Sequence, residues 1–229
     1  MIDLHTHILP NMDDGSRDAA QSHQMLEASA AQGVKRLVLS PHFYPWEESL
    51  RDFLSRREGA FAQLSRQGAW PRLHLGAEVA YFSGISQCQE LPLLRIEGTD
   101  LILIEMPFKQ WSRSELDEVA AISVRTGLTP VLVHVERYRK FVNFQAALSE
   151  LLERGVLTQC NAESLQSFFS ARWLASMLRE EKVHFLGSDC HNMQNRPPNM
   201  GFAAEKMKKL MGEAAFAAFE DNAESQFAE

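Results

Sequence analysis

Two histidines, His5 and His7, lie one residue apart at the end of the first apolar segment of the chain. The preceding alternation of apolar and polar residues predicts a β-strand over residues 2–5. Both imidazoles can leave the end of this strand together, and imidazole is the commonest metal ligand in proteins. Because a His-x-His pair also arises by chance on protein surfaces, the pair alone indicates a metal site only weakly.

Metal-ligand residue types recur in the same position along the chain, at or just after apolar segments. Imidazole and carboxylate together suit Mn, Fe, Zn and similar divalent ions, and no thiolate is positioned with them. Four carboxylates in one small volume would repel one another unless cations neutralise them. Nine ligands are more than one ion accepts, which predicts two or three ions in one large site. The nine candidate ligands are His5, His7, Asp14, His42, Glu78, Glu105, His134, Asp189 and His191.

Some of these residues also have an ordinary structural explanation. Glu105 could be a helix cap or a salt-bridge partner, and Asp189 could cap the next helix. Three other histidines, His23, His74 and His184, do not follow a predicted strand and are interpreted as helix or strand residues. Five of the eight histidines do follow predicted strands, and this joint pattern favours the metal site.

The elements that would hold these side chains alternate between strand-like and helix-like segments. The expected strands cover residues 2–5, 36–40, 72–78, 100–105, 130–134, 156–161 and 183–188. The expected helices cover residues 16–32, 47–68, 116–126, 143–154, 165–181 and 203–211, with a capping box at Ser112 and Glu115 before the third. The alternation predicts a parallel α/β fold. Metal-ligand residue types at six of seven strand ends favour a closed (β/α)7 barrel over an open sheet with a crevice.

Composition restricts the class of protein further. The 229 residues, 45% of them hydrophobic, suit one α/β domain over residues 1–229. The formal net charge of −7 and the lack of a Lys/Arg cluster argue against nucleic-acid binding. We expect no membrane span, because no apolar stretch approaches roughly 18–20 residues, and no signal peptide, because the N-terminus lacks basic residues. The three cysteines form no CxxC pair, which predicts a reduced, cytoplasmic setting.

Several motifs resemble those of one enzyme superfamily, and they extend from residue 2 to about residue 200. They are Ile2-Asp3-Leu4-His5-Thr6-His7-Ile8, Asp13-Asp14-Gly15, Ser40-Pro41-His42, Leu75-Gly76-Ala77-Glu78, Ile104-Glu105, Val133-His134-Val135-Glu136-Arg137-Tyr138, Gly187-Ser188-Asp189-Cys190-His191-Asn192 and Arg196-Pro197-Pro198. At these residues the chain resembles the polymerase-and-histidinol-phosphatase (PHP) superfamily of metal-dependent phosphoesterases. More narrowly, it resembles the bacterial protein-tyrosine phosphatases of capsule and exopolysaccharide synthesis.

The resemblance implies a distorted (β/α)7 barrel with a trinuclear site at the C-terminal strand ends. That site often contains manganese, and Fe, Zn, Co or Mg would also suit it. The resemblance further implies that the nine candidates are the ligands and that Arg137 and Arg196 bind the substrate phosphate. The implied substrate is phosphotyrosine on a bacterial tyrosine kinase of polysaccharide synthesis. Relatives include ring-shaped assemblies, which leaves a homo-oligomer open, and the sequence identifies no interface.

The expected reaction hydrolyses a phosphomonoester without a cysteinyl intermediate. A metal-activated water attacks phosphorus, while Arg137 and Arg196 clamp the phosphate oxygens with planar guanidinium groups. Without the resemblance, Arg137 would be interpreted as a salt-bridge partner of Glu136, and Arg196 as a solvated loop residue. The segment Phe43-Tyr44-Pro45-Trp46 after His42 is a candidate for the substrate mouth.

Cys190 and Arg196 have the C-x5-R spacing of cysteine-dependent tyrosine phosphatases. That chemistry needs a thiolate in a loop whose backbone amides cradle phosphate, usually with glycines before a helix. The intervening residues contain no glycine, and Cys190 lies between two candidate ligands. The thiolate route is therefore disfavoured.

Two other functions remain open. The chain could be a PHP phosphatase for a small molecule such as histidinol phosphate or a nucleotide, which a substrate panel would distinguish. It could also be a metal-binding scaffold or kinase regulator without catalysis. Substitutions at ligand positions would indicate such a regulator, and the sequence shows none.

Overall fold

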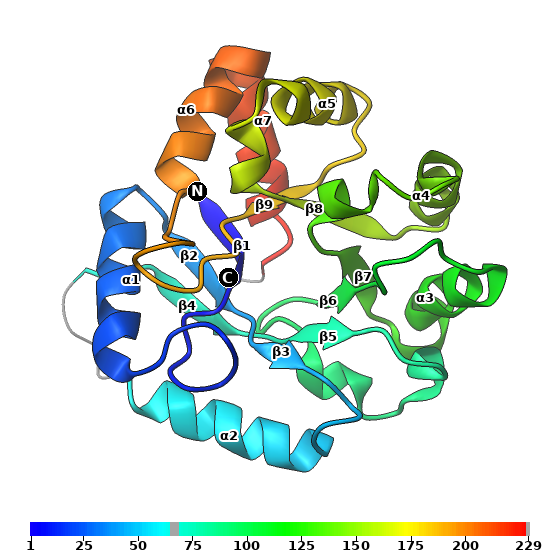
Figure 1. Cartoon of the computed structure of the whole chain (residues 1–229), viewed down its shortest axis with the longest axis horizontal. Helices are drawn as coiled ribbons and strands as arrows, with labels where there is room; N and C mark the ends of the chain where they lie inside the picture. The colour runs from blue at the N-terminus through cyan, green and yellow to red at the C-terminus, as the bar shows by residue number, and fades with distance from the viewer. Residues whose placement is uncertain (65–68, 228–229) are drawn as a thin grey trace.

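The computed structural model describes residues 1–64 and 69–227. In this part of the chain, short parallel strands curl around a common centre and helices surround them (Figure 1). The strands are β1 (Ile2–Thr6), β2 (Arg36–Leu39), β3 (His42–Phe43), β4 (Arg72–Leu75), β5 (Glu78–Ala80), β6 (Leu101–Glu105), β7 (Thr129–Leu132), β8 (Leu157–Asn161) and β9 (Phe185–Gly187). The predicted parallel α/β fold is confirmed.

The strands form one three-stranded sheet, β1-β2-β4, and one six-stranded sheet, β3-β5-β6-β7-β8-β9. All strand pairs are parallel. The chain after β9 returns to β1, where the His7 amide donates to the Cys190 carbonyl at 2.9 Å and the Asp189 amide donates to the His5 carbonyl at 2.8 Å. The two sheets therefore continue one another as a single curled parallel arrangement.

The predicted strand over residues 72–78 is wrong as one element, because it breaks at residues 76–77 into β4 and β5. The Gly76 amide donates to the Leu39 carbonyl at 2.9 Å. The Gly76 carbonyl accepts a 2.9 Å hydrogen bond from the Arg57 side chain instead of a neighbouring strand. A Cβ at Gly76 would lie 3.2 Å from Cγ1 of Val38, so this close passage favours glycine. The short strand β3 was not predicted.

The helices are α1 (Ala19–Ala31), α2 (Leu50–Ala62), α3 (Arg113–Thr126), α4 (Phe144–Glu153), α5 (Phe168–Arg179), α6 (Met200–Met211) and α7 (Glu213–Glu224). The predicted helix over residues 47–68 begins later, at Leu50, and residues 65–68 lie outside the described part of the chain. The capping box of α3 is confirmed, because Ser112 and Glu115 each bond the other's backbone amide. The helix α7 was not predicted.

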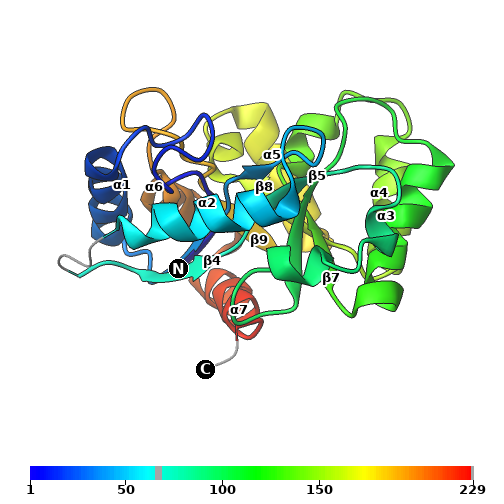
Figure 2. The same ribbon diagram turned by 90° about the horizontal axis from the view of Figure 1, so that it is seen from below.

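Apolar side chains fill the inside of the curled sheet. Ile2, Leu4 and Val131 from the strands pack in one buried cluster with Ala223 of α7 and with Phe227 beyond it. The helix α7 lies on one side of the strands, and the loops after β1 and β9 lie on the opposite side (Figure 2). One end of the sheet is thus closed by apolar packing, which leaves the carboxyl ends of the strands for polar side chains. Within the described residues, no helix has the length and apolar character needed to cross a membrane.

Candidate metal centre

The structure brings all nine predicted ligand side chains together at the carboxyl edge of the curled sheet. The carboxyl ends of parallel strands share one edge, so residues far apart in sequence meet there. The cluster consists of His5 in β1, His7 and Asp14 after it, His42 in β3, Glu78 in β5, Glu105 in β6, His134 after β7, and Asp189 and His191 after β9.

Ligand atoms within this cluster approach one another to within 4.8 Å in three groups. The groups are His7, Asp14, His42 and His191; His5, His7 and Asp189; and His42, Glu78 and Glu105. His134 lies outside these groups, but its Nε2 is 2.9 Å from Glu78 Oε1 and 3.3 Å from Glu105 Oε1. Because His7 and His42 each belong to two groups, the three groups adjoin one another.

Glu78 lies at the centre of the cluster and is buried. Its Oε2 lies 3.0 Å from His5 Nε2 and 2.9 Å from His42 Nδ1, and its Oε1 faces His134. Burial alone would raise the pKa of Glu78, but the charges of His5 and His42 and the hydrogen bond from His134 outweigh it and lower the pKa well below its usual value. Glu78 is therefore a carboxylate at neutral pH, the form that binds cations.

Asp13, which was not predicted to take part in the site, supports the cluster from outside. Its Oδ2 lies 2.7 Å from His7 Nδ1 and accepts a 2.9 Å hydrogen bond from the His42 amide. Its Oδ1 accepts from the Gly15 amide at 2.9 Å. A carboxylate on Nδ1 directs Nε2 toward the cluster and increases the basicity of the imidazole. A Cβ at Gly15 would lie 2.2 Å from the His7 carbonyl oxygen, so only glycine fits in this turn.

Two amide side chains of β8 also support the cluster, and neither was predicted. Gln159 Oε1 accepts a 2.8 Å hydrogen bond from the His134 amide and lies 3.4 Å from His5 Nδ1. Gln159 Nε2 donates to Asn161 Oδ1 at 3.0 Å, and Asn161 Nδ2 donates to Asp189 Oδ2 at 2.7 Å. A Cβ at Gly187 would lie 2.7 Å from Gln159 Nε2, so this glycine leaves room for the chain of hydrogen bonds.

The two predicted phosphate-binding arginines meet at the edge of the cluster. Arg137 lies in the 3-10 helix Val135–Tyr138, and Arg196 lies in the loop before α6. Their Nη2 atoms lie 2.5 and 2.6 Å from the same oxygen, Asp189 Oδ2. Burial would raise the pKa of Asp189, but the charges of His5, His7 and Arg137 and the hydrogen bond from His7 outweigh it and lower the pKa. The alternative interpretation of Arg137 as a salt-bridge partner of Glu136 does not match this geometry, because the carboxylate that Arg137 contacts is that of Asp189.

The residues of the cluster fit divalent ions. Nε2 of His191 is buried and makes no hydrogen bond within the described residues, although Asp14 Oδ1 lies 3.2 Å away. His134 and Asp189 have φ angles of 38° and 53°, in the left-handed region. Such backbone costs about 1–3 kcal/mol in a residue other than glycine and concentrates at functional sites. Five imidazoles and four carboxylates form a donor set for hard or borderline cations.

Cys190 does not belong to the polar cluster. It is fully buried and packs in the apolar core between the sheet and the helices. Burial and the nearby charge of Asp3 raise the pKa of the Cys190 thiol. The arginine of the C-x5-R spacing, Arg196, contacts Asp189 and not the thiol of Cys190. The C-x5-R spacing therefore does not correspond to a thiolate site.

A curled parallel sheet that collects imidazoles, carboxylates and two guanidinium groups at its carboxyl edge defines an α/β protein of the metal-dependent hydrolase type. The chain belongs to the capsular polysaccharide synthesis family CpsB/CapC, whose model matches residues 1–227. The resemblance indicated by the sequence motifs is thereby confirmed.

Known relatives are similar to nearly the whole chain. It is 31% identical to the tyrosine-protein phosphatase YwqE of Bacillus subtilis (strain 168), with 98% of this chain and 90% of that protein covered. It is 29% identical to the tyrosine-protein phosphatase CpsB of Streptococcus pneumoniae, with 93% and 91% covered. The crystal structures of YwqE and CpsB, described as unique metal-dependent tyrosine phosphatases, include a chain with a TM-score of 0.82 and 27% identity, covering 99% of this chain and 94% of that one.

Proposed function

We propose that this chain is a metal-dependent protein-tyrosine phosphatase of the cytoplasm. Its proposed substrate is a phosphotyrosine-bearing tyrosine kinase of capsule or exopolysaccharide synthesis. The observation that carries the proposal is the convergence of Arg137 and Arg196 on Asp189, beside a cluster that suits metal ions. Membership of the CpsB/CapC family and the names of the relatives support it.

The proposed architecture is a single domain over residues 1–229 with a distorted (β/α)7 barrel. Seven strand positions result when β2 with β3, and β4 with β5, are counted as interrupted strands. The nine clustered residues are the proposed ligands of two or three divalent ions, with manganese as the first candidate. The three adjoining groups of ligand atoms support this number.

Solvent reaches the site at Asp14, which belongs to the cluster, and at the two arginines beside it. The side chain of Asp14 is 67% exposed, whereas Glu78 and Asp189 are 1% and 3% exposed. Arg137 and Arg196 are 36% and 35% exposed. A phosphate arriving from solvent on this side would meet the two guanidinium groups and the ligand cluster together.

Divalent ions bound in the cluster would supply an activated water and neutralise the charge of the phosphate. Arg137 and Arg196 would bind its oxygens, because each guanidinium has five N–H donors and the contact with Asp189 leaves several of them free. Asp189 would hold both arginines in place before the substrate arrives. The phenolate of tyrosine, with a pKa of about 10, leaves more readily than an alkoxide, so the reaction does not require a side-chain acid.

Turnover of a tyrosine-phosphorylated peptide by the purified protein tests this function. Activity should require Mn²⁺, disappear with EDTA and return when the metal is added again. Histidinol phosphate and a nucleotide monophosphate in the same assay test the small-molecule alternative. Faster turnover of either one would replace the proposed substrate class. Tight metal binding without hydrolysis of any ester would indicate a non-catalytic regulator.

A further inference from the structure

Aromatic side chains stand on one side of the candidate metal centre, in the segment after β3. The ring of Tyr44 stacks on the imidazole of His42, with centroids 5.1 Å apart and planes inclined by 21°. The ring of Trp46 lies 5.4 Å from that of Tyr44 and is 64% exposed. Tyr44 and Trp46 thus extend the cluster outward as a first aromatic wall.

A second aromatic wall stands beside His134, in the loop after β6. The ring of Phe108 is 5.8 Å from the His134 imidazole and 5.2 Å from the ring of Tyr138, and it is inclined by only 18° and 17° to these rings. Phe108 is 49% exposed, whereas Tyr138 is buried. Phe108 therefore presents ring surface to solvent while it stacks on a residue of the cluster.

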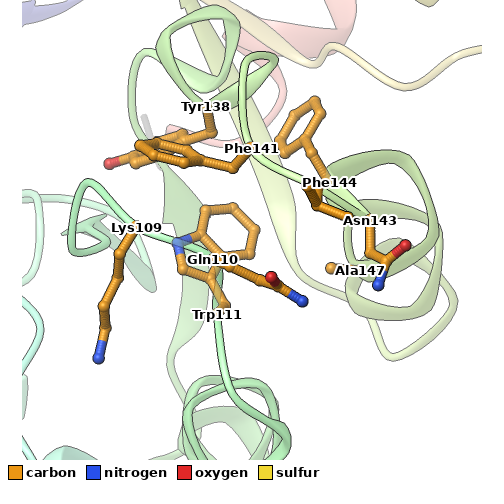
Figure 3. A pocket seen from close by; sticks show the side chains of 9 residues that line it. Lys109, Gln110, Trp111, Tyr138, Phe141, Asn143, Phe144 and Ala147 are labelled. Carbon is orange, nitrogen blue, oxygen red and sulfur yellow. The ribbon is translucent and has the colours of Figure 1, made fainter.

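The second wall rests on a firmly packed base. Tyr138 donates its hydroxyl to the Met106 carbonyl at 2.8 Å and meets Trp111 edge-on at 4.9 Å. Trp111 also meets Phe144 edge-on, with ring centroids 5.9 Å apart, and Figure 3 shows Tyr138, Trp111 and Phe144 around one hollow. The hollow that these side chains line has a volume of about 20 Å³, room for one water at most. The base thus offers no binding cavity of its own, and it fixes the position of Phe108.

Both walls are tied to one carboxylate. His42, beneath the first wall, lies 2.9 Å from Glu78 Oε2, and His134, beside the second, lies 2.9 Å from Glu78 Oε1. The two oxygens of Glu78 therefore connect the two aromatic walls through a single buried side chain. The two aromatic walls therefore border the same cluster, one at His42 and the other at His134.

We propose that Trp46 and Phe108, supported by Tyr44 and Tyr138, form a subsite for the aromatic ring of an aryl phosphate ester. The inference rests on the proposed phosphatase function and adds which residues recognise the alcohol part of the ester. Exposed large aromatic rings beside a polar cluster often mark a ligand-binding surface, because a ligand that covers them removes apolar area from water. Stacking of an aryl group in offset or edge-to-face geometry adds to the gain from buried area. An alkyl ester has no ring to use this surface.

Binding of two phosphonates that the enzyme does not hydrolyse tests the subsite. Phenylphosphonate and methylphosphonate share the anionic group and differ in the ring. Calorimetry on the manganese-loaded protein should show tighter binding of phenylphosphonate by about tenfold, which corresponds to one aromatic contact of about 1.4 kcal/mol. Phe108→Leu and Trp46→Leu should each reduce this preference several-fold and leave methylphosphonate binding within twofold of wild type.

Two controls separate recognition from folding. Phe108→Tyr keeps a ring and should keep the preference. Phe61→Leu removes a 36% exposed ring near the end of α2 and should change the affinity for neither phosphonate. Equal affinity of the wild-type protein for the two phosphonates would contradict the aromatic subsite and leave the proposed phosphatase function untouched. If neither phosphonate binds and no phosphate ester is hydrolysed, the proposed function and the subsite both fail.

Discussion

Arg137 and Arg196 donate to the same oxygen of Asp189, at 2.5 and 2.6 Å. The other oxygen of this carboxylate lies 3.8 Å from His5 Nε2 and 3.4 Å from His7 Nε2. Asp189 therefore divides the site into a part that suits metal ions and a part that suits an anion. This division makes the two kinds of residue experimentally separable.

Replacing Arg137 by alanine is expected to lower kcat/KM for a phosphotyrosine peptide by about 10²- to 10³-fold, the usual loss for one donor to a charged transition state. Metal content per chain should remain that of wild type, because Asn161 still donates to the same Asp189 oxygen. Arg137→Lys should be intermediate, since lysine keeps the charge but not the planar fork. Steady-state kinetics with elemental analysis checks both points. A variant that loses its metal would instead assign Arg137 a structural role.

Replacing Asn161 by alanine should have the opposite effect, a lower affinity for metal with activity that excess metal restores. Its Nδ2 holds Asp189, and its Oδ1 is the acceptor for Gln159, so the change loosens a proposed ligand and its support. We expect metal affinity to fall about 10- to 100-fold, as is typical when a group that orients a ligand is lost. Activity should recover at high metal concentration.

Thr158→Val is the matched control for the Asn161 variant. Thr158 lies in the same strand, but its hydroxyl donates to the Lys182 carbonyl, outside the cluster. This variant should lower the melting temperature without changing the metal dissociation constant, measured by competition with a chelator. Similar metal affinity for Asn161→Ala and wild type would show that the β8 amides do not position the centre.

The positions of the proposed ligands were predictable because the parallel fold carries strand ends to one edge, whatever their separation in sequence. The supporting residues were not. Asp13 and Asp14 are adjacent carboxylates, and only the geometry shows that Asp13 holds His7 while Asp14 faces His191. Gln159 is a polar residue in a buried strand, and its partners come from other strands, so no local spacing reveals them.

Local chain interruptions were equally hidden from sequence patterns. The run from residue 72 to 78 has the composition of one strand, and at the break the Gly76 carbonyl accepts a hydrogen bond from Arg57 of α2. The role of α7 also depends on tertiary packing, because Ala223 is buried against strands from the opposite end of the chain. Local patterns of hydrophobicity do not predict contacts between segments that are distant in sequence.

Thiol reagents should leave the activity intact. Burial raises the pKa of the Cys190 thiol, so almost no thiolate forms at neutral pH, and the side chain is fully enclosed. Iodoacetamide at pH 7.5 is expected to leave Cys190 unlabelled by mass spectrometry and turnover unchanged. Cys190→Ser should keep most of the activity, with a lower melting temperature because a hydroxyl replaces a thiol in an apolar core. An inactive but folded and metal-loaded Cys190→Ser protein would restore the thiolate mechanism.

Metal binding should release protons, and His134 and His191 should differ in their contributions. Burial lowers the pKa of His134, but its hydrogen bonds with Glu105 and Glu78 outweigh this effect and raise the pKa to about 9 in the metal-free protein. His134 is then protonated at pH 7 and must lose its proton to bind a cation. Burial and the charge of His7 lower the pKa of His191 to about 4, so this residue is already neutral and releases none.

The affinity for Mn²⁺ should therefore rise with pH, by about tenfold per unit between pH 7 and 8 for each proton displaced. The gain should level off as the pH passes the pKa of His134 near 9. Calorimetry in buffers with different ionisation enthalpies counts the released protons directly. His134→Gln should release one proton fewer than wild type, and His191→Gln the same number. An affinity independent of pH over this interval would contradict the protonated state of His134 in the metal-free protein.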